Sequence, residues 1–353
     1  MPKSVIAGAL SCLLVLCGLL TSPGFAECLA EENSRGGQGA LKVHLNSGCT
    51  ESEREARAID ASKILDAIKK GQAVDLAGVV VRGDLVFDPL PVTATPPAVE
   101  GMPDSSAKEV RVVAGHFSIV NSVVRGAIRH RSAQGFLLFQ SPVRLSGTTF
   151  ERLVDLSRSV FARPVTLSDA VFLQEIYFVQ CEFLSELTAE KTAFGPHTRF
   201  HRSKFHGPVT FMQSGFSGLA EFLEVVFDRE ANLSRTYFKS GTGFSGSRFK
   251  ELADFSEALF EGDAFFTFTQ FDGDVFFRRA TFRATADFDD AQFNAREDFS
   301  KVFFEKGPQF SKAKRSSQAP ATTGIENPQI QYAITLSLLL FSALLIVYLI
   351  RSR

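Results

Sequence analysis

The sequence predicts an all-β solenoid, in which the chain winds into stacked coils and each strand pairs in parallel with the equivalent strand of the next coil. Two observations predict this fold. Every eleventh residue from Phe150 to Phe304 is phenylalanine, and a second series with the same period, from Leu156 to Phe310, departs from Phe or Leu only at Ala189. The chain holds 36 Phe but 4 Tyr and no Trp. Because Phe carries no polar group that needs a partner, this bias indicates a dry interior.

Small or β-branched residues stand two places before each series, such as Ser159, Ala170 and Cys181 before the first. A small-x-Phe spacing is a period of two, which is typical of a short strand with both side chains inward. The column before the second series is mostly Val, Ala and Thr and departs at Ile176, Leu187, Glu297 and Pro308. Cys181 lies within a small-residue column, so we expect an inert buried thiol.

An eleven-residue period also occurs in right-handed α-helical coiled coils. At that period the four apolar columns would fall at roughly 0°, 30°, 165° and 230° around a helix, which is no single face. The segment also contains residues that are unfavourable inside helices, among them Pro164, Pro196 and Pro208. These observations exclude the helical alternative.

Units such as "FDGDVFFRRATF" (271–282) and "FRATADFDDAQF" (282–293) resemble the Phe-centred pattern of pentapeptide-repeat proteins. The resemblance covers about Val112 to Phe310. It implies a right-handed quadrilateral parallel β-helix with one repeat on each side. Here every second side carries one extra residue, which gives 22 residues per coil instead of the 20 of four five-residue repeats. The geometry of the corners therefore stays open.

The region before Phe150 shows the same eleven-residue period of apolar residues less regularly. Gln134 misses it, and a first partial coil is expected at Leu76, Val81 and Phe87. We therefore expect the β-helix over 72–310, with a Pro-rich, off-phase loop inserted at 88–109. Five residues are expected on the eleven-residue beat: Phe117, Val123, Ile128, Phe139 and Leu145.

The N-terminal residues predict export. Residues 1–26 combine Lys3, an uncharged apolar stretch from Val5 to Leu20 and small residues at a cleavage site ending at Ala26, as in a secretory signal peptide. Whether this segment is cleaved or retained as a second anchor stays open. A lipoprotein attached through Cys28 is disfavoured, because Glu27 precedes it where a small residue is expected.

Two further elements are expected before the β-helix. Residues 27–50 are predicted to be a flexible leader, and Cys28 and Cys49 within it are hypothesised to pair in an oxidising compartment, with two free thiols as the alternative. Residues 51–71 predict a capping helix, because Ile64, Leu65 and Ile68 recur at helical spacing before Gly71. A solenoid needs such a cover over its first coil.

The C-terminal residues predict a membrane anchor. A polar linker at 311–329 leads to Ile330–Ile350, which is uncharged and, at ~1.5 Å per residue, about 32 Å long as a helix. The chain then ends in a basic tail with Arg351 and Arg353. We expect a single-pass protein of a bacterial cell membrane, with the β-helix on the periplasmic or extracellular side.

Catalytic and metal sites are not indicated. No phosphate-binding loop, GxSxG, CxxC or HExxH pattern occurs, so we expect no enzyme activity, cofactor or metal. His197, His201 and His206 are close in sequence, but on a coil their side chains are expected to diverge.

The charge pattern argues against nucleic-acid binding. The net charge is −1, with a basic band at Arg199, Arg202 and Lys204 and an acidic stretch over 251–298. The family resemblance suggests a DNA-mimicking, topoisomerase-binding protein as a less favoured alternative, which the expected export opposes.

Four phenylalanines lie off the inward columns and are the candidate partner surface: Phe265, Phe268, Phe276 and Phe303. Tyr177 and Tyr237 are also outward, and the alternative is that such rings tuck under corners. We expect a non-enzymatic scaffolding or protein-interaction module with an unknown partner and oligomeric state. The other hypothesis is an accessory or sensor domain of a membrane channel, associating through Ala333 and Ser337.

Overall fold

The computed structural model describes residues 27–32, 39–93, 109–130 and 135–315. Among these residues, no helix is long and apolar enough to cross a membrane. The expected signal segment (1–26), most of the linker (311–329) and the expected membrane helix (Ile330–Ile350) lie outside the described residues.

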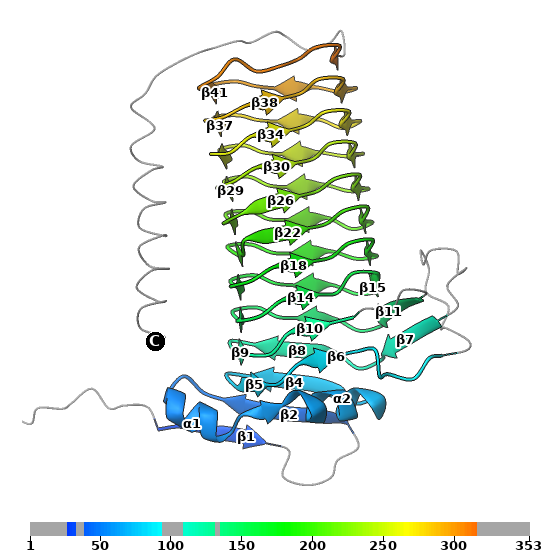
Figure 1. Cartoon of the computed structure of the whole chain (residues 1–353), viewed down its shortest axis with the longest axis vertical. Coiled ribbons are helices and arrows are strands. Elements are labelled where there is room, and N and C mark those ends of the chain that lie inside the picture. The colour runs from blue at the N-terminus through cyan, green and yellow to red at the C-terminus, as the bar shows by residue number, and fades with distance from the viewer. Residues whose placement is uncertain (1–26, 33–38, 94–108, 131–134, 316–353) are drawn as a thin grey trace, which may run out of the picture.

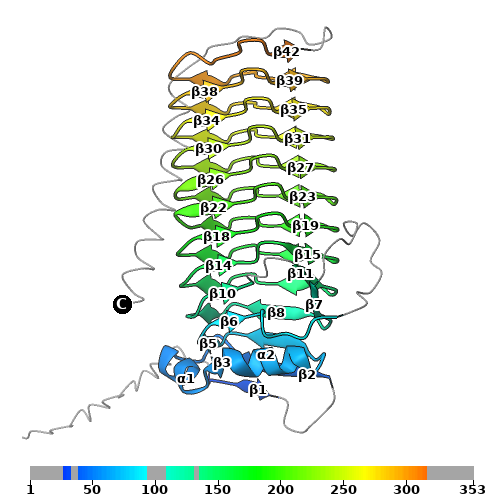
Figure 2. The same ribbon diagram turned by 45° about the vertical axis from the view of Figure 1, so that its right-hand side comes forward.

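The described chain forms a four-sided rod of stacked coils (Figures 1 and 2). Each side is one sheet, and from β4 to β41 successive strands pass through the four sheets in rotation. The last strand, β42, skips one side and pairs with β39. Strand pairs are parallel, except that β1 runs antiparallel to β2. The predicted parallel, four-sided β-solenoid is therefore confirmed, and we name its sides sheets A to D.

Sheet A contains β1 (Ala30–Glu32), β2 (Ala40–Leu45), β4 (Ala73–Ala77), β8 (Phe117–Val120), β12 (Val143–Arg144), β16 (Val165–Thr166), β20 (Leu187–Thr188), β24 (Val209–Thr210), β28 (Ala231–Asn232), β32 (Ala253–Asp254), β36 (Val275–Phe276) and β40 (Glu297–Asp298). Sheet B contains β3 (Ile59–Asp60), β5 (Val80–Arg82), β9 (Val123–Val124), β13 (Thr149–Phe150), β17 (Val171–Phe172), β21 (Ala193–Phe194), β25 (Gly215–Phe216), β29 (Tyr237–Phe238), β33 (Leu259–Phe260), β37 (Thr281–Phe282) and β41 (Phe303–Phe304).

Sheet C contains β6 (Leu85–Val86), β10 (Ile128–Arg129), β14 (Val154–Asp155), β18 (Ile176–Tyr177), β22 (His197–Arg199), β26 (Leu219–Glu221), β30 (Thr242–Gly243), β34 (Ala264–Phe265) and β38 (Ala286–Asp287). Sheet D contains β7 (Glu109–Val113), β11 (Gly135–Phe139), β15 (Ser159–Phe161), β19 (Glu182–Phe183), β23 (Lys204–Phe205), β27 (Val226–Phe227), β31 (Arg248–Phe249), β35 (Gln270–Phe271), β39 (Gln292–Phe293) and β42 (Lys314–Arg315).

The phenylalanine series fill the interior of the rod. Members of the first series from Phe150 to Phe293, and of the second from Leu156 to Phe288, are at most 3% exposed. Partners 22 residues apart stack face to face, as Phe260 and Phe282 do at 4.5 Å between ring centroids with planes 1° apart. Many rings of the two series meet edge to face, as Phe260 and Phe266 do with planes 78° apart, which is the other favourable aromatic geometry.

Several polar members of the inward small-residue column also complete hydrogen bonds between coils. The hydroxyl of Thr192 donates to the carbonyl oxygen of Leu167 at 2.9 Å and is fully buried. The Cys181 thiol makes the equivalent contact with the Leu156 carbonyl oxygen at 3.1 Å. Burial raises the pKa of Cys181, so the expected inert buried thiol is what this position holds.

The corners alternate between two geometries, which accounts for the extra residue. Two residues connect sheets A to B and C to D, such as Ser256 and Glu257 between Phe255 and Ala258, and the second of them has a positive φ. Three residues connect B to C and D to A, such as those between Phe260 and Ala264. The coil therefore reaches 22 residues through its three-residue corners.

The predicted eleven-residue register is wrong at three positions before Gly135. Phe117 and Ile128 align with Val143 and Val154 in the small-residue columns, and Phe150 pairs with Val124 rather than aligning with Val123. The reason is that 26 residues, not 22, separate Val113 from its partner Phe139. Phe139 and the first partial coil (Leu76, Val81, Phe87) lie inward as predicted.

The N-terminal region is more ordered than expected. In place of a flexible leader, β2 extends sheet A by pairing with β4. In place of one helix over 51–71, two helices form, α1 (Glu51–Ala56) and α2 (Ala61–Lys69), because β3 pairs with β5 between them. α2 buries Ile64 and Ile68 in the main core and packs against β4 and β6.

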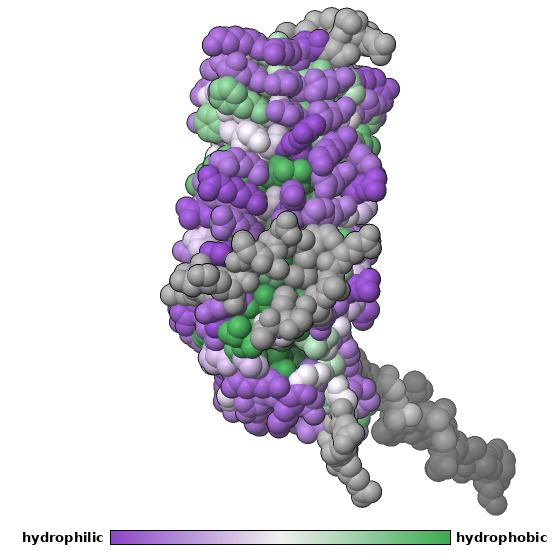
Figure 3. Space-filling model, turned by 90° about the vertical axis from the view of Figure 1, so that its right-hand side faces the viewer, coloured by the Kyte–Doolittle hydropathy of each residue, from purple (hydrophilic) through white to green (hydrophobic). Residues whose placement is uncertain are grey.

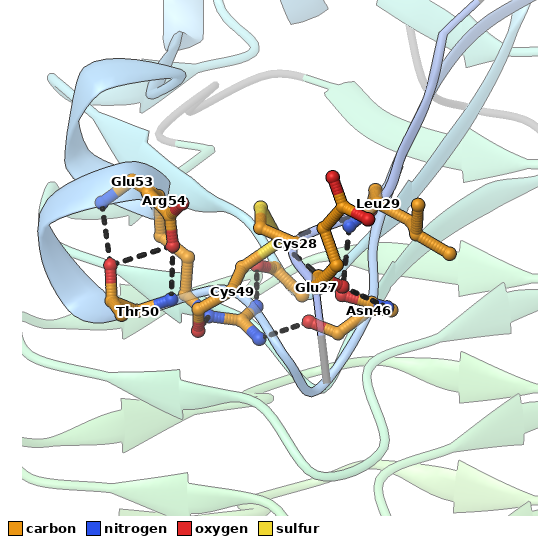
Figure 4. Close-up of a disulfide and its surroundings, with 9 residues drawn as sticks. Glu27, Cys28, Leu29, Asn46, Cys49, Thr50, Glu53 and Arg54 are labelled. Atoms are coloured by element: carbon orange, nitrogen blue, oxygen red, sulfur yellow. Dashed lines mark hydrogen bonds between the residues drawn. A yellow bond between two sulfur atoms is a disulfide. The ribbon is translucent and has the colours of Figure 1, made fainter. Parts of the chain in front are cut away.

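Cys28 and Cys49 form a disulfide that ties the start of β1 to the N-terminus of α1 (Figure 4). Thr50 caps that helix, since its hydroxyl accepts the Glu53 N–H at 3.3 Å and the Glu53 carboxylate accepts the Thr50 N–H at 2.8 Å. Arg54 donates to the backbone oxygens of Cys49 and Asn46. The first residues are thereby attached to the end of the rod.

The expected inserted loop at 88–109 is described only at its two ends, where Val92 bridges Arg111. Beside it, the outer face of sheet D carries an apolar cluster of Val110, Phe136, Leu138 and Val160. Figure 3 faces this side and shows apolar residues gathered in its lower half, with a more hydrophilic surface above.

Near the distal end, one inward position holds a carboxylate. Glu297 aligns with Val275 in sheet A, and its side chain is 7% exposed. One carboxylate oxygen lies 3.2 Å from Nη1 of Arg315, and the other is buried without a hydrogen-bond partner among the described residues. Burial raises the pKa of Glu297.

We predict that Glu297→Ala stabilises the distal coil at neutral pH. Because the pKa is raised in the folded chain, the carboxyl favours folding when protonated and opposes it as pH rises through that raised pKa. Removing it should slow hydrogen exchange of β40 and β42 at pH 7, by about 1 kcal/mol in opening free energy, and much less under acidic conditions. Glu305→Ala, at an exposed carboxylate of the same coil, is the control. Faster exchange in Glu297→Ala at pH 7 would show instead that the pair with Arg315 is net stabilising.

Candidate interaction surface

The structure places the four candidate phenylalanines on different sides of the rod. Phe265 is on the outer face of sheet C and is 39% exposed, and Phe268, at the following corner, is 61% exposed. Phe303 is 39% exposed on sheet B, and Phe276 is half-buried on sheet A. Only Phe265 and Phe268 are neighbours, so the four do not form one surface.

Phe276 is packed rather than free. The guanidinium carbon of Arg278 lies 3.8 Å from its ring centroid, and that of Arg296 lies 4.8 Å from it. Cation–π contacts of this kind stabilise a ring on a polar wall. The two outward tyrosines also have partners, since Tyr177 packs beside His197 and the Tyr237 hydroxyl donates to Glu261 at 2.7 Å.

Phe268 differs from every equivalent residue of the rod. It has a φ of +57°, at the corner position that recurs every eleven residues. The other residues at this position from 158 to 312 are polar, charged or Gly: Arg158, Asp169, Gln180, Lys191, Arg202, Gln213, Glu224, Arg235, Gly246, Glu257, Arg279, Asp290, Lys301 and Lys312. A bulky side chain in this conformation is unfavourable, and this one gains little burial in return.

The coil beneath places glycine directly under Phe265 and directly under Phe268. Phe265 pairs with Gly243, and Gly246 is the corner residue one coil before Phe268. A Cβ on Gly243 would lie 2.9 Å from Cδ2 of Leu223, and one on Gly241 would lie 3.4 Å from Cδ1 of Leu219, which is 40% exposed.

These residues define one apolar surface, the sheet C patch: Leu219, Leu223, Gly241, Gly243, Gly246, Phe265 and Phe268. The glycines and leucines were not singled out from the sequence. The signal for them is the run "GTGFSG" (241–246), which can be interpreted only once the 22-residue register is known.

The histidines do not all diverge as expected. His197 Nε2 lies 2.8 Å from one carboxylate oxygen of Glu221, and His201 Nε2 lies 4.0 Å from the other. Arg199 donates to the same carboxylate at 2.7 Å. Although burial alone acts to raise it, the bonds from His197 and Arg199 hold the pKa of Glu221 below its usual value. His206 is separate and lies between Glu182 and Asp228.

This convergence is an ion-pair cluster rather than a metal centre. The Arg199 guanidinium already binds the Glu221 carboxylate oxygen that a metal ion would need as a ligand. Within the described ranges, no group of three or more His, Cys, Asp or Glu side chains is arranged to hold a metal ion.

Charges on the outer faces are largely paired between neighbouring coils. Arg202 of the basic band pairs with Glu224, and Arg199 with Glu221. Most acids of the 251–298 stretch also pair with arginines: Glu251, Glu257, Glu261, Asp272, Asp274, Glu297 and Asp298. A wall neutralised in this way is a poor imitation of the charge of DNA.

We predict that Phe268→Asn raises the free energy of unfolding by about 1 kcal/mol, because Asn adopts a positive φ at lower cost than Phe. Thermal unfolding of the purified protein measures the change. Gln213→Asn, at an equivalent exposed corner, should change it less. A clear loss of stability in Phe268→Asn would mean that the ring contributes packing to the fold.

Comparison with known proteins supports the repeat assignment. A family model described as pentapeptide repeats (9 copies) matches residues 222–270. No curated protein matches the chain, and no solved structure matches it. The matched residues belong to the same phenylalanine ladder that fills the rod on both sides of them. Residues 222–270 therefore match the pentapeptide-repeat family, and the parallel β-solenoid around them fits a pentapeptide-repeat protein with Phe-rich repeats.

Proposed function

We propose that this chain is a non-enzymatic scaffolding module that binds a partner protein through the sheet C patch. The observation that carries the proposal is Phe268, an exposed ring at a corner position where the other residues from 158 to 312 are polar, charged or Gly. Together with Phe265 it exposes apolar area at a cost in backbone strain. A bound partner that covers both rings would bury this apolar area, and the free energy of that burial would offset the strain.

The interior of the rod supports a role without catalysis. The inward columns are filled by stacked rings and small residues, so chemistry would have to arise on the outer walls. There, most charged groups of the acidic stretch are tied in ion pairs between coils. The pentapeptide-repeat β-solenoid is in general a non-enzymatic fold.

We also propose that the β-helix is exported and tethered to a membrane, with the N-terminal helices capping its first coil. The disulfide between Cys28 and Cys49 supports export, since such bonds persist in oxidising compartments. The burial of Ile64 and Ile68 of α2 supports the cap. The anchor rests on the apolar sequence Ile330–Ile350.

Thiol labelling under denaturing conditions tests export. A cleaved, exported chain should accept a polyethylene-glycol maleimide at Cys181 alone before reduction, and at Cys28 and Cys49 as well afterwards. A retained signal segment would add Cys12 and Cys17 in both samples. Equal labelling with and without reduction would contradict export.

Partner capture with the intact, membrane-extracted chain tests the binding proposal. We predict that Phe265→Ser combined with Phe268→Ser abolishes specific capture while the melting temperature stays within a few degrees, because both rings are substantially exposed. Phe303→Ser, at a ring that is equally exposed on sheet B, should leave capture unchanged. If the double variant captures the same partner as the native chain, the patch is not the binding surface.

A further inference from the structure

The sheet C patch has carboxylates directly above it. Asp287 pairs in register with Phe265 on the outer face of sheet C. Asp290 is the corner residue one coil after Phe268, and the Phe268 N–H donates to the backbone oxygen of Asp289 at 3.1 Å. Phenylalanine and aspartate therefore stand on adjacent coils of the same side.

These carboxylates differ from most other acids of the distal half of the rod. Among the described residues, Asp287, Asp289 and Asp290 lie in no ion pair, whereas most acids of the 251–298 stretch pair with arginines of neighbouring coils. Backbone N–H groups hold two of the three, since Asp287 accepts from Asp289 at 2.9 Å and Asp289 accepts from Ser311 at 2.6 Å. Asp254 and Asp263 are the other two acids of that stretch without an ion pair, and backbone N–H groups hold them too. The negative charge of Asp287 and Asp289 is thus fixed in place without a compensating cation.

The order of chemistry along this side is apolar and then acidic. Leu219 and Leu223 begin the patch on either side of Glu221, whose carboxylate is paired with Arg199 and His197. The glycine coil follows, and Phe265 with Phe268 stands next to the unpaired aspartates. Leu219 and Asp289 lie about three coil spacings apart, roughly 14 Å at ~4.8 Å per coil. At ~1.5 Å per residue, a helical segment of about ten residues spans that length.

We propose that the partner presents to this side a short protein segment in which apolar side chains are followed by lysine or arginine. This inference rests on the proposed function and specifies its ligand. Apolar groups of the segment cover Phe265, Phe268 and the leucines, and its cations neutralise the aspartates, which have no such partner in the rod. The same negative charge disfavours nucleic acid and anionic lipid as occupants, because like charges placed together in an interface repel.

Immobilised ten-residue peptides test the proposal with the full chain in an uncharged detergent. All peptides share leucine at four positions, and the remaining positions hold lysine, glutamine or glutamate. We expect the lysine peptide to bind at least tenfold more tightly than the other two, with affinity that falls as salt is raised. Both the triple variant Asp287→Asn/Asp289→Asn/Asp290→Asn and the double variant Phe265→Ser/Phe268→Ser should weaken it at least tenfold.

The matched control is Asp254→Asn, which removes a carboxylate that likewise pairs with no arginine but lies on sheet A. It should leave binding unchanged, and far-ultraviolet circular dichroism should show that every variant stays folded. Equal binding of the three peptides, with loss in the phenylalanine variant alone, would overturn the inference and leave the proposed function standing. Binding of the lysine peptide that no variant weakens, or no binding at all, would overturn the inference. Partner capture that survives the phenylalanine variant would refute the proposed function itself.

Discussion

The stacking of equivalent residues 22 positions apart is the constraint on which the rest of the structure depends. It places Phe260 on Phe282 at 4.5 Å and pairs their backbones in the same step. One register therefore both stacks the rings of the interior and forms the hydrogen bonds of the sheets. A substitution at one position consequently alters contacts with the coil above and with the coil below. The same register supplies hydrogen-bond partners to several polar groups of the interior, as it does for Thr192.

The same constraint makes exceptions informative. Since each outer position recurs in every coil, a residue can be judged against its own column. Phe268 stands out because its column is otherwise polar, charged or Gly. Gly243 and Gly246 stand out because they place no side chain directly beneath Phe265 and Phe268. Sheet C thus carries an exposed apolar surface at positions where the equivalent corner residues are polar, charged or Gly.

Much of the interior could be predicted from the sequence, because an eleven-residue phenylalanine period has few physical explanations. The early register could not be, since the 26-residue step to Phe139 shifts the phase without leaving a mark in composition. The candidate surface could be predicted only in part. Phe265 and Phe268 could be identified from the sequence because they lie outside the two inward phenylalanine series. Leu219, and the contacts of His197 and His201 with Glu221, could not, because they depend on neighbours one coil away.

An experimental structure of the full chain at a resolution that shows ring orientation would test the central claim most directly. The account predicts phenylalanine rings stacked with their partners 22 residues away, and Phe268 at a positive φ with its ring outside the wall. A coil of another length, or a Phe268 ring packed beneath its corner at a negative φ, would contradict both the register and the surface inferred from it.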